Sequence, residues 1–187
     1  MSRPSRIDID QVLDAAMAVF WSRGYGAASM DALVQATGAA RYGLYGAFDG
    51  KDGLYLAALG RYQQVIVNRL FAGVEARDAG PEQIEGYFDG LLAMAGSAQG
   101  RWGCLMVNAA VERAPDDRAV AAVVETYRAR LRQGFATVLA RGRKGGADQA
   151  EHLVSLSFGI SVQARAGSAA ADLAAAVRAG LSARAAR

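Results

Sequence analysis

Residues 29–51, SMDALVQATGAARYGLYGAFDGK, decide the fold. Ser29 predicts a helix N-cap, because its hydroxyl can accept a hydrogen bond from a free backbone amide. Gly38 predicts the end of that helix, since glycine readily adopts the left-handed conformation. A second helix is expected at once, over about residues 39–46, with Leu44 as an apolar anchor. Two short helices around a glycine turn form the helix-turn-helix pattern, whose second helix enters the major groove of DNA.

The flanking segments extend this pair to a three-helix unit. Asp8 is expected to cap a first helix, whose apolar stripe has the spacing of a core-facing surface. The stripe consists of Val12, Ala16, Val19 and Phe20. After the pair, Lys51 opens a long helical pattern that continues to about Gly73. That helix is long enough to connect the three-helix unit to a separate body.

The run from Val12 to Leu59 resembles the N-terminal DNA-binding domain of the tetracycline-repressor (TetR) family. The features that carry the resemblance keep the order and spacing of the family over about fifty residues. They are Phe20, Gly24, Thr37-Gly38, Leu44-Tyr45, Phe48, Lys51 and Leu54. The chain departs from the family pattern at Ala40, Tyr42 and Gly46-Ala47, so the resemblance does not give the operator sequence. It implies a regulator of transcription that binds a palindromic operator in double-stranded DNA.

The second helix of the pair and the residues beside it are the expected DNA contacts. Arg41, Tyr42 and Gly43 are placed against base edges, where an arginine can donate two hydrogen bonds to guanine. Tyr45 and Lys51 are placed on phosphates, which add affinity without sequence preference. Ser29, at the start of the preceding helix, completes the predicted interface.

The chain as a whole predicts an all-α protein of two parts. Residues 1–50 form the helix-turn-helix domain, and residues 51–187 form a helical domain for ligand binding and dimerisation. The net charge is +3. Within residues 1–62, six basic residues balance six acidic ones, so the excess lies in the body. The DNA-binding interpretation therefore depends on where individual cations lie, rather than on net charge.

The last two helical patterns, at about 148–166 and 169–185, predict a homodimer. Both carry apolar stripes, and a helix that is apolar on two faces must be covered on two sides. The predicted interface consists of Leu153, Leu156, Phe158, Ile160, Leu173, Val177 and Leu181. Burial of these helices within one subunit is the alternative. A two-fold dimer is favoured because it reads two half-sites of a palindrome.

No grouping of residues predicts catalysis or a metal site, and no enzyme activity or cofactor is expected. The single histidine, His152, is expected to be solvated. Glu112, Asp116 and Asp117 flank a helix break and are interpreted as capping residues. The body contains aromatic and sulfur side chains that could surround a small, largely apolar effector. The candidates are Phe88, Met94, Trp102, Cys104, Met106, Asn108, Tyr127 and Phe135.

Two other functions remain open from the sequence. Cys104 could make the protein a sensor of oxidants or electrophiles, with Arg101 near in sequence to stabilise its thiolate. The chain could also bridge DNA without any effector. No apolar stretch is long enough to span a membrane, and a single cysteine forms no internal disulfide. Together these features predict a cytoplasmic protein.

Overall fold

Helices account for all the regular structure in the described part of the chain. The computed structural model describes residues 8–142 and 146–182, and no strand occurs among them. The elements are α1 (Ile9–Arg23), α2 (Met30–Thr37), α3 (Arg41–Phe48), α4 (Gly50–Tyr62), the π turn η1 (Gln63–Val67), α5 (Asn68–Glu75), α6 (Pro81–Ala95), the 3-10 turn η2 (Gly100–Trp102), α7 (Leu105–Glu112), α8 (Arg118–Arg141), α9 (Ala147–Ala166) and α10 (Ala170–Ser182). The all-α prediction is confirmed.

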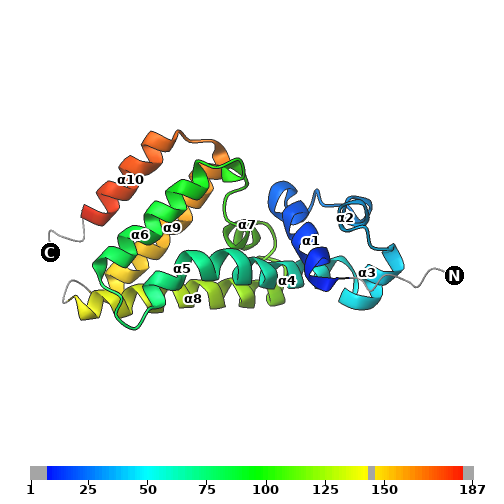
Figure 1. Ribbon diagram of the computed structural model, residues 1–187, viewed down its shortest axis with the longest axis horizontal. Coiled ribbons are helices and arrows are strands. Elements are labelled where there is room, and N and C mark those ends of the chain that lie inside the picture. Colours follow the sequence, from blue (N-terminus) through cyan, green and yellow to red (C-terminus); the bar gives the residue numbers. More distant parts are fainter. Residues whose placement is uncertain (1–7, 143–145, 183–187) are drawn as a thin grey trace.

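Helices α1–α3 form a small unit at one end of the molecule, which we call the head (Figure 1). Its local signals act as predicted. Asp8 caps α1 by accepting from the backbone N–H of Asp10 at 3.0 Å. Ser29 Oγ accepts from the backbone N–H of Ala32 at 3.1 Å and so caps α2. Gly38 ends α2 with φ of 65°. The head is therefore shaped by interactions that lie close together in the sequence.

One continuous rod of helix connects the head to the rest of the molecule. It consists of α4, η1 and α5, and its start packs against α1 and α3. The long helix predicted from Lys51 exists, but it is not a uniform α-helix. The π turn Gln63–Val67 interrupts it midway, and π turns are rare features that often occur at functional sites. The proposed domain boundary after residue 50 falls at the start of this rod.

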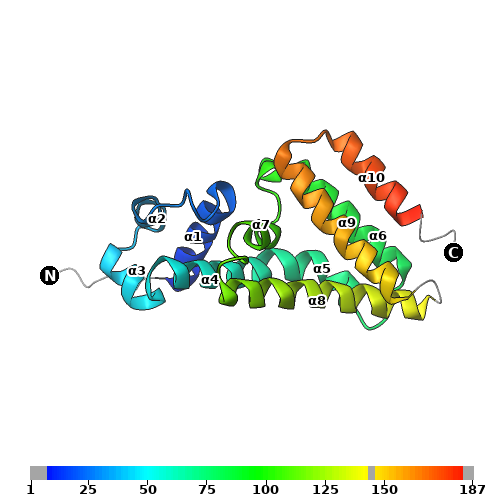
Figure 2. The same ribbon diagram turned by 180° about the vertical axis from the view of Figure 1, so that it is seen from behind.

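The remaining helices form the body. Helix α8 runs beside the rod, α6 pairs with α9, and α10 lies against both α6 and α9 at the end far from the head (Figure 2). An aromatic cluster fills the core of the body, with ring centroids of Phe71, Tyr87 and Phe135 separated by 5.4–5.5 Å. Helix α7 sits between this body and the head, and packs against α1 and α4 as well as α8 and α9.

Candidate nucleic-acid interface and ligand cavity

Helix α3 has an aromatic side chain, that of Tyr42, that is almost fully exposed to solvent. Tyr42 is 90% exposed and Tyr45 is 48% exposed, whereas Leu44 is buried and anchors the helix. The guanidinium of Arg41 forms an ion pair with Asp31 of α2. Gly43, between these side chains, is partly buried. The exposed side of α3 thus carries Arg41, Tyr42 and Tyr45, as a helix that enters a DNA groove requires.

The other two predicted DNA contacts have additional roles within the chain. Ser29 is exposed, and its hydroxyl accepts from Ala32 as the cap of α2. Lys51 lies over the ring of Tyr25, with Nζ 4.1 Å from the ring centroid. Partial burial lowers the pKa of Lys51, although the neighbouring carboxylates of Asp52 and Glu112 oppose this effect. Lys51 is therefore held against the head in this structure, rather than extended into solvent.

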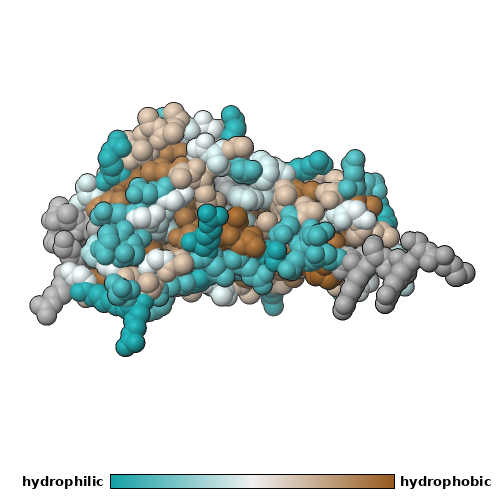
Figure 3. Space-filling model, viewed as in Figure 1, coloured by the Kyte–Doolittle hydropathy of each residue, from teal (hydrophilic) through white to brown (hydrophobic). Residues whose placement is uncertain are grey.

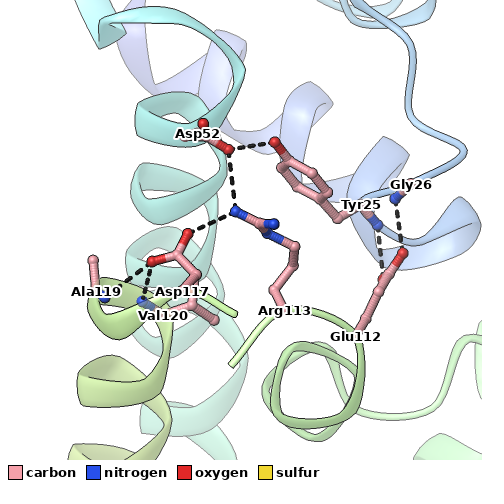
Figure 4. Close-up of polar contacts among 8 residues, drawn as sticks. All are labelled: Tyr25, Gly26, Asp52, Glu112, Arg113, Asp117, Ala119 and Val120. Carbon is pink, nitrogen blue, oxygen red and sulfur yellow. Dashed lines mark hydrogen bonds and ion pairs between the residues drawn. The ribbon is translucent and has the colours of Figure 1, made fainter. Parts of the chain in front are cut away.

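A polar clasp joins the head to the body. The carboxylate of Glu112, at the end of α7, accepts hydrogen bonds from the backbone N–H groups of Tyr25 at 2.9 Å and Gly26 at 2.7 Å (Figure 4). These two residues form the turn between α1 and α2. The prediction that Glu112 is a capping residue is wrong, because its carboxylate reaches across the fold instead of serving its own helix break. Asp117 does cap α8, accepting from Ala119 N–H at 3.0 Å.

Arg113 and Tyr25 complete this clasp, which we define as Tyr25, Asp52, Glu112, Arg113 and Asp117. Arg113 donates to Asp117 at 2.8 Å and lies 3.5 Å from Asp52. Its guanidinium carbon is 4.4 Å from the centroid of the Tyr25 ring. The Tyr25 hydroxyl donates to Asp52. Burial, followed by this bond to Asp52, raises the pKa of Tyr25 to about 12.

A cavity of about 870 Å³ lies where the head, the rod and the body meet. Its walls come from α1, η1 and the helices on either side of it, α6, the segment around η2, α8 and α9. In the space-filling view, hydrophobic side chains gather in the middle of the molecule, around α5, α6 and the segment before α7 (Figure 3). Among the described residues that line the cavity there is no Asp, Glu, Lys or His, and Arg69 is the one charged residue. The volume falls within the range of small-molecule sites.

Four of the eight predicted pocket residues line this cavity: Met94, Trp102, Cys104 and Tyr127. The other four are placed elsewhere: Phe88, Met106, Asn108 and Phe135. Phe88 and Phe135 stack on each other in the body core, with ring planes 10° apart. Met106 is fully buried. Asn108 donates from Nδ2 to the carbonyl oxygen of Trp102 at 2.8 Å, so it supports the wall rather than facing the cavity.

Sequence reasoning missed three aromatic side chains of the cavity wall: Trp21, Tyr62 and Tyr87. Trp21 comes from the head, and its ring packs edge-on against Trp102 at 5.3 Å and Tyr62 at 5.0 Å. Met17 and Trp21, four residues apart on α1, form a second apolar stripe beside the predicted one. That second stripe was the available signal, because a helix of a small head needs only one stripe to cover its own core.

Hydroxyl groups and the Cys104 thiol meet on one side of this cavity. Cys104 Sγ lies 3.9 Å from the Tyr127 hydroxyl. Burial raises the pKa values of Tyr62, Tyr87 and Tyr127, so all three carry their protons at neutral pH. Arg101, the cation suggested for Cys104, is exposed, and its guanidinium lies beside Gly167 instead.

The predicted dimer residues divide into two groups. Four of them are buried within the subunit: Leu153, Ile160, Leu173 and Val177. Ile160 also lines the cavity. Leu156, Phe158 and Leu181 remain partly exposed. The exposed side of α9 carries Ser155, Gly159 and Val162, and Val162 is 50% exposed. A partner would meet this outer side of α9, because the inner stripe is already covered by the same chain.

Two absences bear on other functions. In the ranges the structure describes, no set of three or more His, Cys, Asp or Glu side chains is arranged to hold a metal ion. Across the same ranges, no helix has both the length and the apolar character that crossing a membrane requires.

Comparison with known proteins places the head in a defined family. The sequence model of the family described as "Bacterial regulatory proteins, tetR family" matches residues 12–58. The chain is 32% identical over 178 residues to the HTH-type transcriptional repressor ComR of Escherichia coli (strain K12), a match that covers 88% of this chain and 83% of ComR. It is 29% identical over 147 residues to the uncharacterized HTH-type transcriptional regulator YezE of Bacillus subtilis (strain 168). This match covers 78% of this chain and 75% of YezE.

The similarity extends through the whole fold. A cysteine variant of the TetR family transcriptional regulator CifR, solved in complex with 26-bp double-strand operator DNA, superimposes with a TM-score of 0.85 at 30% identity. The match covers 97% of this chain and 99% of that chain. The arrangement of head, rod and body described above therefore occurs in a protein that has been solved on its DNA.

Proposed function

The chain belongs to the TetR family of bacterial transcriptional regulators, which bind double-stranded DNA, and we propose that it is a repressor released from a palindromic operator by a small ligand. The observation that carries this proposal is the cavity of about 870 Å³ whose wall includes Met17, Ala18 and Trp21 of the head. A molecule in this cavity would touch the head and the body at once. It could therefore favour one placement of the head over another.

The chemistry of the cavity wall points to a largely apolar ligand that carries no positive charge and has hydrogen-bonding groups. The described part of the wall has no acidic side chain that could balance a cation. The hydroxyls of Tyr62, Tyr87 and Tyr127 and the thiol of Cys104 offer hydrogen-bonding groups, which buried polar ligand groups need. Trp21 and Trp102 provide flat apolar surface for the rest of the molecule.

Release of the protein from DNA follows if ligand binding and DNA binding are thermodynamically linked. A ligand shifts an equilibrium only by its differential affinity for the two states, and a thousandfold preference corresponds to about 4 kcal/mol. Operator DNA must then weaken ligand binding by the same factor.

The chain contains two tryptophans, and both line the cavity. Intrinsic tryptophan emission therefore reports on this site, and N-phenyl-1-naphthylamine is a suitable neutral, apolar probe. We expect the probe to change tryptophan emission and to lower affinity for an operator selected with the wild-type protein. Ala164→Leu would fill part of the cavity and should weaken probe binding, while Ala122→Leu, at an exposed position of α8 that does not line the cavity, should not. A saturating probe that leaves operator affinity unchanged would contradict the proposal.

The dimer is part of this proposal. The small side chains of Ser155 and Gly159 on the exposed side of α9 allow a partner helix to approach closely, and nothing lies within 4 Å of the position a Cβ of Gly159 would take. Val162→Asp would place an unpaired charge in such an interface, which is strongly unfavourable. Sedimentation of the wild type as a monomer at micromolar concentration, together with tight binding to a palindrome, would exclude this assembly.

A second candidate function is thiol-based sensing through Cys104. The feature that favours it is position: the thiol lines the cavity beside the Tyr127 hydroxyl, where an oxidant or electrophile that enters would meet it. Cys104→Ser separates the two functions. A ligand-gated repressor keeps its response to the probe in this variant, whereas a thiol sensor loses its response to oxidants while operator affinity is retained.

A further inference from the structure

Two unsatisfied polar atoms lie at the clasp, one on Arg113 and one on Tyr55, which packs beside it. Among the described residues, Tyr55 Oη and Arg113 Nε are the buried side-chain nitrogen and oxygen atoms that have no hydrogen-bond partner. Arg113 belongs to the clasp, and the Tyr55 ring packs 5.0 Å from that of Tyr25. Buried polar atoms without partners are rare, because each one loses its bonds to water. Two of them in one place indicate that other contacts hold the clasp in this arrangement.

Glu112 supplies two of those contacts directly to the backbone of the head. Its two carboxylate oxygens accept from two successive backbone N–H groups, those of Tyr25 and Gly26, at 2.9 and 2.7 Å. Hydrogen bonds to an ionised carboxylate are stronger than those between neutral groups. The head has two further hydrogen bonds to the body at Trp21: Arg165 donates to the Trp21 carbonyl oxygen at 3.3 Å, and the Trp21 indole donates to the carbonyl oxygen of Gly103 at 2.9 Å. Both of those bonds are made at Trp21 within α1, whereas Glu112 holds the turn that leads from α1 to α2.

The site of attachment determines what Glu112 can control. Gly26 precedes the start of α2 by four residues, and α2 leads directly into α3. A shift of the turn between α1 and α2 therefore moves both helices of the helix-turn-helix pair relative to the body. In a two-fold dimer, the same shift changes the separation of the two α3 helices. Half-site spacing in an operator follows that separation.

We propose that Glu112 is a positioning residue for DNA recognition, which fixes the angle between head and body and thereby selects the spacing between operator half-sites. The selection of spacing rests on the proposed dimer, whereas the attachment of the head rests on the contacts of Glu112 alone. Recognition of bases within a half-site belongs to α3 and is separate from this role.

Two variants disturb the attachment from opposite sides. Glu112→Gln keeps the size of the side chain but replaces one accepting oxygen by an NH₂ group, which cannot accept from a backbone N–H. Gly26→Ala acts from the head, because a Cβ there would lie 3.3 Å from Glu112 Oε1. Glu125→Gln is the matched control. It removes an exposed carboxylate that pairs with Arg128 on α8, away from both the clasp and the cavity.

The test measures affinity for duplexes that carry two inverted copies of one half-site, separated by spacers of increasing length, and for a duplex with a single copy. The wild type should prefer one spacer, and Glu112→Gln should reduce that preference by about fivefold or more. Affinity for the single copy should change less than about twofold. Gly26→Ala should behave like Glu112→Gln, and Glu125→Gln like the wild type. A merely structural role for Glu112 would lower both affinities together.

Amide hydrogen exchange at Tyr25 and Gly26 provides the second measurement. Both amides should exchange faster in Glu112→Gln and remain unchanged in Glu125→Gln. A spacer preference that stays sharp in both clasp variants overturns the proposal, as does exchange that is equal to that of the wild type. If the wild type itself shows no spacer preference, the dimer proposal fails, and exchange alone decides whether Glu112 holds the head.

Discussion

Trp21 donates its indole N–H to the carbonyl oxygen of Gly103 at 2.9 Å, across 82 positions of sequence. This bond ties the end of α1 to the segment that forms one edge of the cavity. Trp21 therefore joins head and body beside the cavity, as Glu112 does in the clasp.

Trp21→Phe should destabilise the protein by about 1–3 kcal/mol, because the smaller phenyl ring keeps only part of the packing and the carbonyl oxygen of Gly103 loses its indole donor. Urea unfolding followed by circular dichroism measures the loss. Trp102→Phe is the control, since the Trp102 indole makes no hydrogen bond within the described residues and its contacts with Asn108 and Arg165 are made by the backbone carbonyl oxygen. Equal losses in the two variants would count against a specific role for this bond.

Gly103→Ala should also destabilise the fold, by about 1–3 kcal/mol, because it forces a side chain into a strained backbone conformation. Gly103 has φ of 68°, and a Cβ there would lie 3.0 Å from the carbonyl oxygen of Ser161. Gly60→Ala, inside α4 with nothing within 4 Å of its Cβ position, should instead raise stability by roughly 0.5–1 kcal/mol. Thermal unfolding of both variants tests whether Gly103→Ala lowers stability and Gly60→Ala raises it.

Arg41→Ala should reduce discrimination at one base pair of each half-site by about 1–3 kcal/mol. Tyr45→Phe should weaken binding to all sequences by a similar factor, because a phosphate contact carries no base preference. Binding to a panel of half-sites with single substitutions separates the two effects. If Tyr45→Phe changed the preferred sequence while Arg41→Ala did not, the assigned roles would be reversed.

Tyr55→Phe should leave stability unchanged or raise it by up to about 1 kcal/mol, since it removes a buried hydroxyl that has no partner. Tyr25→Phe is the informative comparison, because the Tyr25 hydroxyl donates to Asp52 and its removal should be destabilising. A large loss of stability in Tyr55→Phe would show that its hydroxyl has a partner in solution.

Glu75→Gln should cost up to about 1 kcal/mol at neutral pH, as expected for a partly exposed ion pair. Arg130 donates to both carboxylate oxygens of Glu75 at 2.6 Å, and these bonds lower the pKa of Glu75 below its ordinary value of 4.5. Because the pKa of Glu75 is lower in the folded protein than in the unfolded chain, the ion pair stabilises the fold at pH values above the unfolded-state pKa. This stabilisation is lost as the pH falls through the folded-state pKa. The stability gap between wild type and variant should therefore close in acid below pH 4.5. A gap that is constant from neutral pH into acid would refute this.

The head could be predicted from sequence because its determinants are local. Ser29 and Gly38 act within a few residues of themselves, and the stripe from Val12 to Phe20 has a fixed period. The clasp could not be predicted in this way. Glu112 and Tyr25 are 87 positions apart, and a glutamate at a helix end satisfies the rules for capping equally well.

The cavity could be predicted from sequence only in part. Aromatic composition suggested an apolar site in the body, but composition does not distinguish the wall of a cavity from a packed core. Phe88 and Phe135 point into the packed cluster, while Trp21 reaches the cavity from the head. Which aromatic side chains line the cavity depends on how α1 crosses the segment around η2, and this crossing is a tertiary contact.

The π turn of the rod has a consequence for how related chains differ in length. A π turn closes each hydrogen bond over one residue more than an α turn does, so Gln63–Val67 absorbs one additional residue without changing the register on either side. A relative with an uninterrupted α-helix at this position should therefore align with a single-residue gap there. On both sides of that gap, Leu59 and Phe71 should keep their places in the core.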